Sequence, residues 1–447
     1  MMDGQSKAGL GSRTRGFALL LLPLLIVTYA GLLRLDALVE RYGTVAGPEP
    51  VEAAQQSAVT LAKSIRPPGF EWRYTGVRRG DPVSYLKIAR MRPSFYEASF
   101  REPLYVASVG AFLRLTGDQD IAVSCASALY STLLVLATYL VGSFAFGRWI
   151  GAGAALLLAV EARVVLLGVD GWRDDAFAFF VLMSAYALLR AAREPSLGAG
   201  LLLGLVSAGA MLTRITSFTF LLPCFLWLIV SGPRRDVGPR FSAISVAILT
   251  AVLLVGPYVL QCLVVYGDPL IAINFATERF YPTVGDASTA SPSWSGFLQR
   301  LLGHRPLATI DTVLRGLTVY PFGNKWEGLR HLGPWLASTL SIAALLGLVM
   351  FVASIEGRLL LVLLFSALAP FAITWEIPGG GEWRFTLFAY PFYLVAAGLA
   401  LSRGFALIRA AAREGPMLAS SVDRRVAAAA VACLVCAVVG AYEIPRY

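Results

Sequence analysis

Residues 121–146 read IAVSCASALYSTLLVLATYLVGSFAF and contain no charged side chain. A helix needs about 20 mostly apolar residues to cross the roughly 30 Å of hydrocarbon in a bilayer, so this run is long enough to span a membrane. Similar apolar runs of 17 or more residues recur throughout the chain. The sequence therefore predicts an all-α polytopic membrane protein, and it excludes a soluble, fibrous or disordered one.

The composition of the whole chain agrees with this prediction. Of the 447 residues, 57% are hydrophobic and 15% are charged, whereas soluble domains carry about 25% charged residues. The net charge of +10 comes almost entirely from arginine, and only four of the 38 basic residues are lysine. Basic residues beside membrane spans usually determine topology and contact anionic headgroups, so we expect no nucleic-acid partner.

Apolar runs between charged residues predict about eleven spanning helices. The expected spans are residues 17–35, 121–146, 148–166, 175–192, 197–213, 215–231, 241–265, 334–354, 358–375, 385–403 and 426–442. The short pair at 197–213 and 215–231 is either two spans or a shallow re-entrant hairpin. We expect a cytoplasmic N-terminus at 1–16, a catalytic membrane module at 17–403, and a basic loop with a terminal helix at 404–447.

The distribution of charge predicts which side of the membrane each loop faces. With a cytoplasmic N-terminus and eleven alternating spans, the inner segments hold fifteen basic and six acidic residues, and the short outer segments hold four arginines. This arrangement satisfies the positive-inside rule. Two long hydrophilic stretches, 36–120 and 266–333, then face outward, so we expect the functional site on the outer face of a bacterial cytoplasmic membrane.

The first outer stretch contains a candidate acidic site residue. Asp81 precedes Tyr85 at helical spacing, so Asp81 is expected near a helix N-terminus, where the helix dipole favours its ionised form. An ordinary helix-capping role is the alternative. Residues 103–117 form an amphipathic stretch that is expected to lie along the interface, with Arg101 and Arg114 directed toward lipid headgroups.

Further candidates lie at the outer ends of later spans. Asp174 and Asp175 open a span, and carboxylate oxygens of this kind suit a hard divalent cation that bridges phosphate. The alternative is helix capping together with an ion pair to Arg173. Arg214 and Arg384 are candidates for binding phosphate, because the planar guanidinium matches phosphate geometry. For each arginine, reaching toward the membrane surface is the alternative role.

In this order, these features resemble the GT-C superfamily of membrane glycosyltransferases, which use polyprenyl-phosphate sugar donors. The similarity is closest to the branch with protein O-mannosyltransferases and the lipid A aminoarabinose transferase. The residues that carry it are Asp81 with Tyr85 and Ala89, Pro103–Tyr105 followed by Gly117, Asp175 before Phe177, Gly200 and Gly204 before Arg214, and Arg384 with Pro391. The family often has a second acidic residue directly after the first, and here Pro82 occupies that position.

The resemblance implies transfer of a sugar from a polyprenyl-phosphate donor to the hydroxyl of a lipid, glycan or protein acceptor, with inversion at the anomeric carbon. It implies Asp81 as general base, Arg384 and Arg214 on the donor phosphate, and Mg²⁺ or Mn²⁺ as an optional cofactor at Asp174 and Asp175. Membrane lipids are the other expected partners. The expected supporting residues are Tyr85, Glu102 and Glu382.

Two other function classes remain open at this point. A ligase or polymerase for lipid-linked polysaccharides also acts on the outer face, and His304 with Arg305 in the second long loop keeps this alternative open. A lipid or polysaccharide transporter requires ionisable residues near the membrane midplane and often repeated halves. The sequence shows few mid-span charges and no internal repeat, which favours an enzyme.

Overall fold

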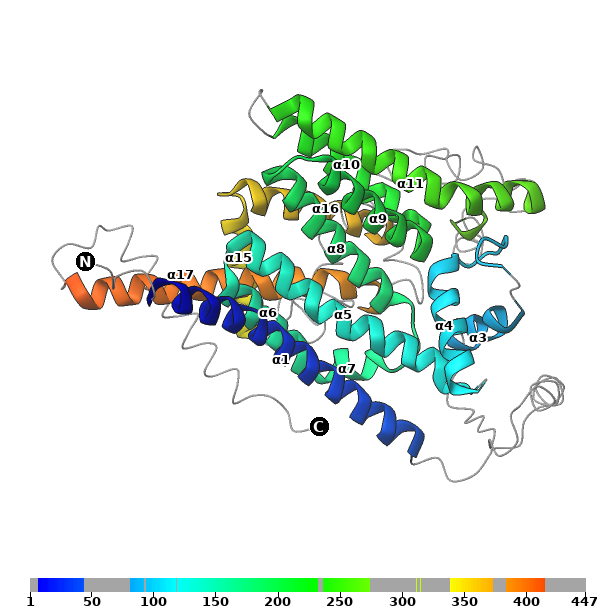
Figure 1. Cartoon of the computed structure of the whole chain (residues 1–447), viewed down its shortest axis with the longest axis horizontal. Coiled ribbons are helices and arrows are strands. Elements are labelled where there is room, and N and C mark those ends of the chain that lie inside the picture. Colours follow the sequence, from blue (N-terminus) through cyan, green and yellow to red (C-terminus); the bar gives the residue numbers. More distant parts are fainter. Residues whose placement is uncertain are drawn as a thin grey trace.

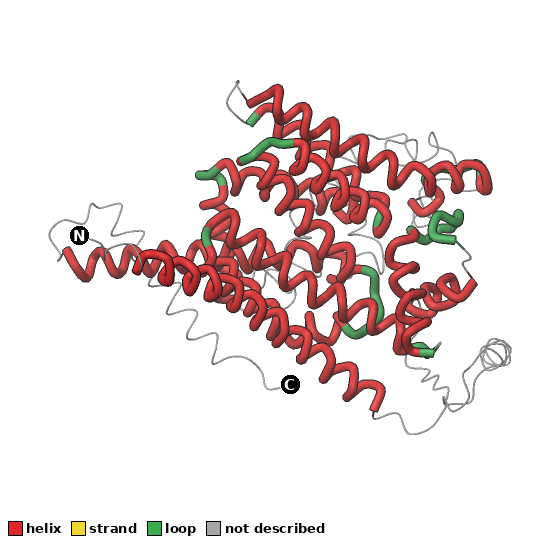
Figure 2. Tube along the Cα trace, in the orientation of Figure 1, coloured by secondary structure: helices red, strands yellow, loops and turns green. Residues whose placement is uncertain are grey.

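The computed structural model describes residues 7–43, 81–91, 94–117, 119–231, 236–273, 311, 314, 338–372 and 383–414. Within these ranges the chain forms helices and no strand (Figure 2), which confirms the predicted all-α class. In chain order the elements are α1 (Lys7–Gly43), α3 (Asp81–Met91), α4 (Pro103–Thr116), α5 (Ile121–Phe146), α6 (Arg148–Val160), α7 (Ala162–Gly168), α8 (Asp174–Arg193), α9 (Leu197–Thr213), η1 (Ile215–Ser217), α10 (Phe218–Val230), α11 (Val237–Tyr266), α15 (Ser338–Phe351), α16 (Ile355–Ala372), η4 (Trp383–Ala389) and α17 (Tyr390–Glu414).

Six of the described helical segments are long and apolar enough to cross a membrane. They lie in α1, α5, α8, α11, α16 and the segment Arg384–Arg409. Helices α6 and α7 pass the same test together as a bent pair, while α9, α10 and α15 belong to shorter apolar helices. Ten of the eleven expected spans therefore coincide with described helices. The expected span at 426–442 lies outside the described residues, so the total of eleven stays a prediction.

Two boundaries differ from the sequence prediction. Helix α1 continues to Gly43, past the expected end at residue 35, because Ala37 and Leu38 pack in one apolar cluster with Ala128 of α5. The expected span 148–166 is broken at Glu161, where α6 and α7 meet at 67°. No proline or glycine marks this break in the sequence.

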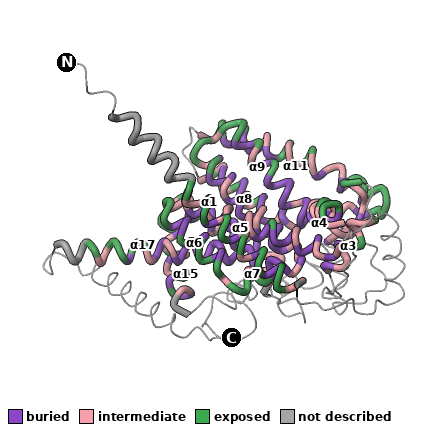
Figure 3. The backbone as a smooth tube through the Cα atoms, turned by 60° about the horizontal axis from the view of Figure 1, so that its bottom comes forward, coloured by how far each residue is buried: buried purple, intermediate pink, exposed green. Residues whose placement is uncertain are grey.

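Helices α5 and α8 lie at the centre of the bundle, and α1 and α11 lie at its edges (Figures 1 and 3). In the most apolar window of each helix, 67% of the residues are buried in α5 and α8, against 22% in α1 and 28% in α11. Helices α9 and α11 approach closely at Gly200 and Gly204, where an added Cβ would collide with the backbone of Ala243 and Ala247. Small residues permit such contact between membrane helices.

Helices α3 and α4 form a small unit beside the N-terminal end of α5, on the right of Figure 1. Their apolar faces meet through Tyr85 and Tyr105, whose rings pack edge to face with centroids 5.0 Å apart. The Tyr105 hydroxyl donates to the carbonyl of Val123 in α5. This packing holds Asp81 and Glu102, at the starts of α3 and α4, against the rest of the bundle.

Candidate active site

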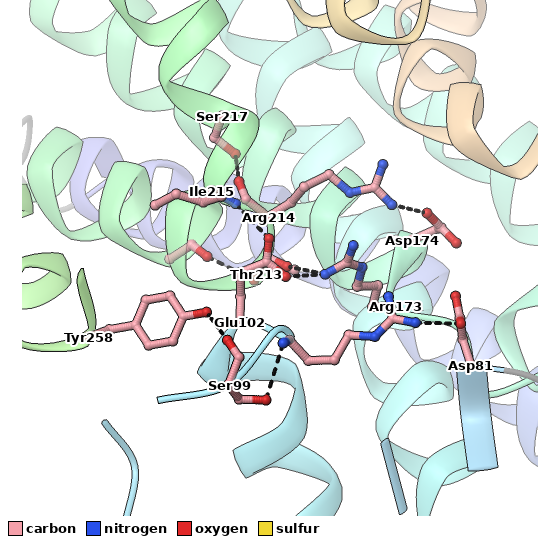
Figure 4. Close-up of polar contacts among 12 residues, drawn as sticks. Asp81, Ser99, Glu102, Arg173, Asp174, Thr213, Arg214, Ile215, Ser217 and Tyr258 are labelled. Atoms are coloured by element: carbon pink, nitrogen blue, oxygen red, sulfur yellow. Dashed lines mark hydrogen bonds and ion pairs between the residues drawn. The ribbon is translucent and has the colours of Figure 1, made fainter. Parts of the chain in front are cut away.

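Charged side chains from five segments meet around the beginning of α8, and Figure 4 shows Asp81, Glu102, Arg173, Asp174 and Arg214 among them. The segments are the start of α3, the chain before α4, the link from α7 into α8, the break between α9 and η1, and η4. We refer to these side chains as the charged cluster. Its members are Asp81, Arg101, Glu102, Arg173, Asp174, Arg214 and Arg384.

The first pair in the cluster joins Asp81 and Arg101. Arg101 Nη2 donates to Asp81 Oδ1 at 2.6 Å, and its guanidinium carbon lies 5.4 Å from the centre of the Tyr85 ring. Arg101 is 12% exposed and Asp81 is 26% exposed. The expectation that Arg101 points toward headgroups is therefore wrong, because the Asp81 carboxylate draws it into the cluster.

The second pair joins Glu102 and Arg173 and fixes three segments together. One Glu102 oxygen accepts from Arg173 Nη1, and the other accepts from the backbone N–H of Ile215 at 3.0 Å. Arg173 also contacts the carbonyl of Thr213 at 3.4 Å. Burial lowers the pKa of Arg173, but Glu102, Tyr85, Asp174 and Asp81 together raise it by more, so the net pKa is raised and Arg173 stays charged. Glu102 thus links the start of α4 to the α7–α8 loop and to η1.

The third group centres on Asp174, which is almost fully buried. Arg214 Nη2 lies 2.8 Å from Asp174 Oδ1, and Arg384 Nη1 lies 3.9 Å from Oδ2. The Arg214 guanidinium lies 4.9 Å from the centre of the Phe177 ring, and that of Arg384 lies 3.7 Å from the centre of the Trp172 ring. Neither arginine is merely reaching toward the membrane surface, and Asp174 pairs with these two residues rather than with Arg173.

Asp175 lies outside this cluster. Its Oδ2 accepts from Ser127 Oγ of α5 at 3.1 Å, inside the helix bundle, and the residue is 0% exposed. Asp174 and Asp175 therefore do not direct their carboxylates to one point. Among the described residues, no group of three or more His, Cys, Asp or Glu side chains is placed to hold a metal. The carboxylates of Asp174 and Asp175 do not fit a shared divalent cation.

The net charge of the cluster favours an anionic ligand. The carboxylates of Asp81, Glu102 and Asp174 stand against the guanidiniums of Arg101, Arg173, Arg214 and Arg384, so three negative charges face four positive ones. Tyr85 lies near Asp81, Arg101, Arg173 and Asp174. Burial raises its pKa, so its hydroxyl is neutral and adds no negative charge. An excess positive charge in a partly enclosed site attracts phosphate.

The structure thus brings together six of the residues selected from the sequence. These are Asp81, Tyr85, Glu102, Asp174, Arg214 and Arg384. Asp175 lies elsewhere, and Glu382, His304 and Arg305 fall outside the described residues. The sequence reasoning assigned no site role to Arg101, Arg173 or Trp172. These three residues come just before Glu102 or Asp174 in the sequence, and this proximity could have identified them as candidates.

Part of the chain is similar to a known protein family. Residues 101–260 match the family model of dolichyl-phosphate-mannose-protein mannosyltransferases, a range that includes five members of the charged cluster. No curated protein sequence matches the chain significantly.

Solved structures of other proteins are similar to this chain to different degrees. The oligosaccharyltransferase AglB of Archaeoglobus fulgidus, solved with an inhibitory peptide and dolichol-phosphate, has a TM-score of 0.56 at 16% identity over 94% of this chain and 54% of its own. The structure of the oligosaccharyltransferase from the same organism with Zn and sulfate has a TM-score of 0.51 at 17% identity, covering 87% and 52%. ArnT of Cupriavidus metallidurans, bound to undecaprenyl phosphate, has a TM-score of 0.48 at 14% identity, covering 87% and 72%.

This chain spans about half the length of the archaeal oligosaccharyltransferase structures that it matches. The shared architecture covers nearly the whole of this chain, and the family match includes five of the seven members of the charged cluster. The resemblance predicted from the sequence is therefore confirmed: the chain has the fold of the GT-C superfamily of membrane glycosyltransferases.

Proposed function

We propose that this protein is a membrane glycosyltransferase that moves a sugar from a polyprenyl-phosphate donor to an acceptor hydroxyl. The observation that carries the proposal is the charged cluster, in which one accessible carboxylate lies beside an excess of arginine. The match to a mannosyltransferase family over residues 101–260 supports it. The dolichol-phosphate in the structure of the archaeal oligosaccharyltransferase supports a lipid-linked donor.

Asp81 is the proposed general base. It is 26% exposed, whereas Glu102 and Asp174 are 3% and 4% exposed, so Asp81 is the carboxylate of the cluster that an acceptor can reach. Arg101 holds one of its oxygens at 2.6 Å and leaves the other for the acceptor. The acceptor oxygen attacks the anomeric carbon while Asp81 takes the hydroxyl proton. General-base catalysis of this kind contributes about 10²–10⁴-fold in rate.

Arg384 is the proposed ligand of the donor phosphate. The bond from the anomeric carbon to the phosphate oxygen breaks with both electrons on the phosphate, and a nearby guanidinium stabilises that charge. Arg214 lies at hydrogen-bond distance from Asp174, whereas Arg384 lies 3.9 Å from the same carboxylate and is 14% exposed. Arg214 thus mainly neutralises Asp174, and Arg384 is placed to contact phosphate. Attack opposite the departing phosphate inverts the anomeric configuration.

The reaction is proposed to occur at the outer surface of a bacterial cytoplasmic membrane. The positive-inside distribution of charge supports this side for the loops that carry the cluster. The peptide in the structure of the oligosaccharyltransferase is consistent with a protein acceptor, and lipid and glycan acceptors remain in the proposal. A divalent cation is a separate expectation, and the chemistry above assigns it no step.

The test uses the full-length protein purified in lipid nanodiscs, a panel of undecaprenyl-phosphate sugars, and mixed lipid, glycan and peptide acceptors. We expect wild-type protein to transfer sugar from at least one donor and Asp81→Asn to lose about 10²–10⁴-fold in turnover. Glu356→Gln is the matched control, because Glu356 forms a similar exposed ion pair with Arg193 away from the cluster. We expect its turnover to equal that of the wild type.

Three outcomes would overturn parts of the proposal. Undiminished turnover by Asp81→Asn removes Asp81 as the base. Absence of transfer from every donor favours a transporter, and transfer of preassembled lipid-linked glycans favours a ligase or polymerase. The same assay with EDTA tests the expected metal, and turnover that survives the chelator contradicts it.

A further inference from the structure

A second set of charges lies inside the helix bundle and does not belong to the charged cluster. Arg34 of α1 is 1% exposed although it lies in an apolar span. A charged side chain in such a position is costly and is retained only where it finds polar partners. Its hydrogen-bond partners come from its own helix, where Nη1 donates to the carbonyl of Ala30, and from two other helices.

Arg34 joins α1 to α5 and α6. Its Nε donates to Ser131 Oγ of α5 at 2.9 Å, and its Nη1 donates to the carbonyl of Ala159 at 3.3 Å. Gly168, the last residue of α7, packs directly on this contact, since an added Cβ would overlap Ser131 and lie 3.7 Å from Arg34 Nε. The guanidinium therefore sits where four helices meet.

Two serines of α5, Ser127 and Ser131, connect Arg34 to the carboxylate of Asp175. Ser127, one helical turn before Ser131, has its Oγ 3.1 Å from Asp175 Oδ2 and 3.2 Å from the carbonyl of Trp172. Arg34 and Asp175 attract each other electrostatically. In the described part of the chain, Arg34 Nη2 and Asp175 Oδ1 are buried without hydrogen-bond partners.

A second arginine of α1 contacts the segment between α7 and α8, which leads to Asp175. Arg41 lies seven residues after Arg34, and two turns of helix place both on one face of α1. Arg41 forms an ion pair with Asp170. Residues 170–173 and the first two residues of α8 are called the loop 170–175 below. Arg41 contacts its first residue directly, and Arg34 is connected to its last residue through Ser131 and Ser127. Between these ends lie Trp172, whose ring stacks on Arg384, and the charged cluster members Arg173 and Asp174.

We propose that Arg34 and Arg41 of α1 form a two-point clasp that positions the loop 170–175 for the charged cluster. Arg34 is a positioning residue that acts through Ser131, Ser127 and Asp175, and Arg41 acts through Asp170. The catalytic meaning of the clasp rests on the proposed function. Its structural content does not, because the position and protection of the loop are measurable without substrate.

The test is hydrogen–deuterium exchange of the peptide that covers residues 168–176, in the full-length protein in nanodiscs. We expect Arg41→Gln, a change at a partly exposed residue, to raise exchange in this peptide about tenfold with little change in Tm. We expect Arg34→Met to raise it at least as much and to lower Tm by roughly 5 °C or more, since it breaks the bond to Ser131 and removes a cation near the buried Asp175 carboxyl group.

The double variant Arg34→Met with Asp175→Asn separates positioning from simple stability. We expect it to recover most of the lost Tm, because no buried charge is left alone, while exchange at 168–176 stays high. Where transfer is measurable, kcat falls with loop exchange and KM for the acceptor changes little. Arg193→Met is the matched control, since its pair with Glu356 lies away from the loop, and we expect wild-type exchange.

The result for Arg41→Gln keeps the clasp falsifiable even if Arg34→Met fails to fold. Wild-type exchange at 168–176 in folded Arg41→Gln, or in the folded double variant, would overturn the clasp. Loss of protection in a protein that transfers no sugar from any donor would instead overturn the proposed function and leave the clasp standing.

Discussion

The two ion pairs Asp81–Arg101 and Asp174–Arg214 belong to one cluster but differ in their surroundings. Their nitrogen–oxygen distances are similar, at 2.6 and 2.8 Å, yet the exposed fractions are 26% and 12% in the first pair and 4% and 9% in the second. Aromatic rings enclose the guanidinium of Arg214, whereas the Asp81 carboxylate is partly open to solvent. Geometry alone would treat the pairs as equivalent, and burial separates them.

This difference assigns distinct physical roles. An exposed ion pair contributes about 0–1 kcal/mol to stability, because water replaces much of the attraction when the pair opens. Removing one partner of a buried pair costs about 3–5 kcal/mol, because the other charge is left without compensation. The buried pair therefore fixes the structure of the cluster, and the exposed pair is the one that can open to a ligand. The predictions below test this comparison through the free energy of unfolding.

Asp174→Asn is expected to have the largest effect on stability. The change removes the carboxylate that is hydrogen-bonded to the buried Arg214 guanidinium, so the free energy of unfolding should fall by about 3–5 kcal/mol. Thermal and denaturant unfolding in detergent micelles measure it. The double variant Asp174→Asn with Arg214→Met should recover most of the loss, and a single-variant loss below about 1 kcal/mol would show that the pair is not effectively buried.

Glu102→Gln is expected to have the next largest effect. The amide oxygen can still accept from the Ile215 N–H, but the charge-assisted bond to Arg173 is lost. Hydrogen bonds to charged groups contribute about 1.5–3 kcal/mol, and we expect a loss in that range. Glu102→Ala removes both bonds and should cost more. Equal losses for the two variants would mean that the Arg173 pair alone accounts for the role of Glu102.

The difference between neighbouring residues also shows what the sequence could predict. Residue type and helix boundaries were enough to select Asp81, Arg214 and Arg384. The helical period was available too: successive residues on a helix point about 100° apart, so Asp174 and Asp175 at the start of α8 could not both face one site. Assigning both to one metal ignored that angle, and the structure places only Asp174 in the cluster.

The pairing of charges could not be predicted in the same way. Glu102 and Arg173 are 71 residues apart, and Arg214 and Asp174 are 40 apart. Their contacts depend on how α4, α8 and α9 pack, which no local pattern encodes. Fold class follows from hydrophobic run length, since a bilayer imposes it on each span separately. The site depends on packing between spans, so the sequence identified its residues better than their partners.

Trp172→Leu is expected to have a smaller effect on the same scale. The Arg384 guanidinium lies 3.7 Å from the centre of the indole, and such contacts contribute about 0.5–2 kcal/mol. We expect a loss of about 1 kcal/mol in unfolding free energy together with a higher KM for the lipid-phosphate donor, because Arg384 loses its fixed orientation. Trp172→Phe keeps an aromatic face and should behave nearly as wild type. An unchanged KM in Trp172→Leu would separate Trp172 from donor binding.

Asp81→Asn is expected to have the smallest effect on stability, within about 1 kcal/mol, since Asp81 is a quarter exposed and water already screens part of its pair with Arg101. Glu356→Gln, at the exposed pair with Arg193, should match it in unfolding free energy. The two variants should differ in turnover, which is expected to fall about 10²–10⁴-fold for Asp81→Asn and to stay at the wild-type level for Glu356→Gln. A carboxylate that served only to begin α3 would give the opposite pattern, with a loss of stability and no specific loss of turnover. The buried Asp174–Arg214 pair should show a large change in unfolding free energy, and the Asp81–Arg101 pair almost none. Unfolding of Asp174→Asn and Asp81→Asn, measured side by side, therefore distinguishes a carboxylate with a structural role from one with a catalytic role.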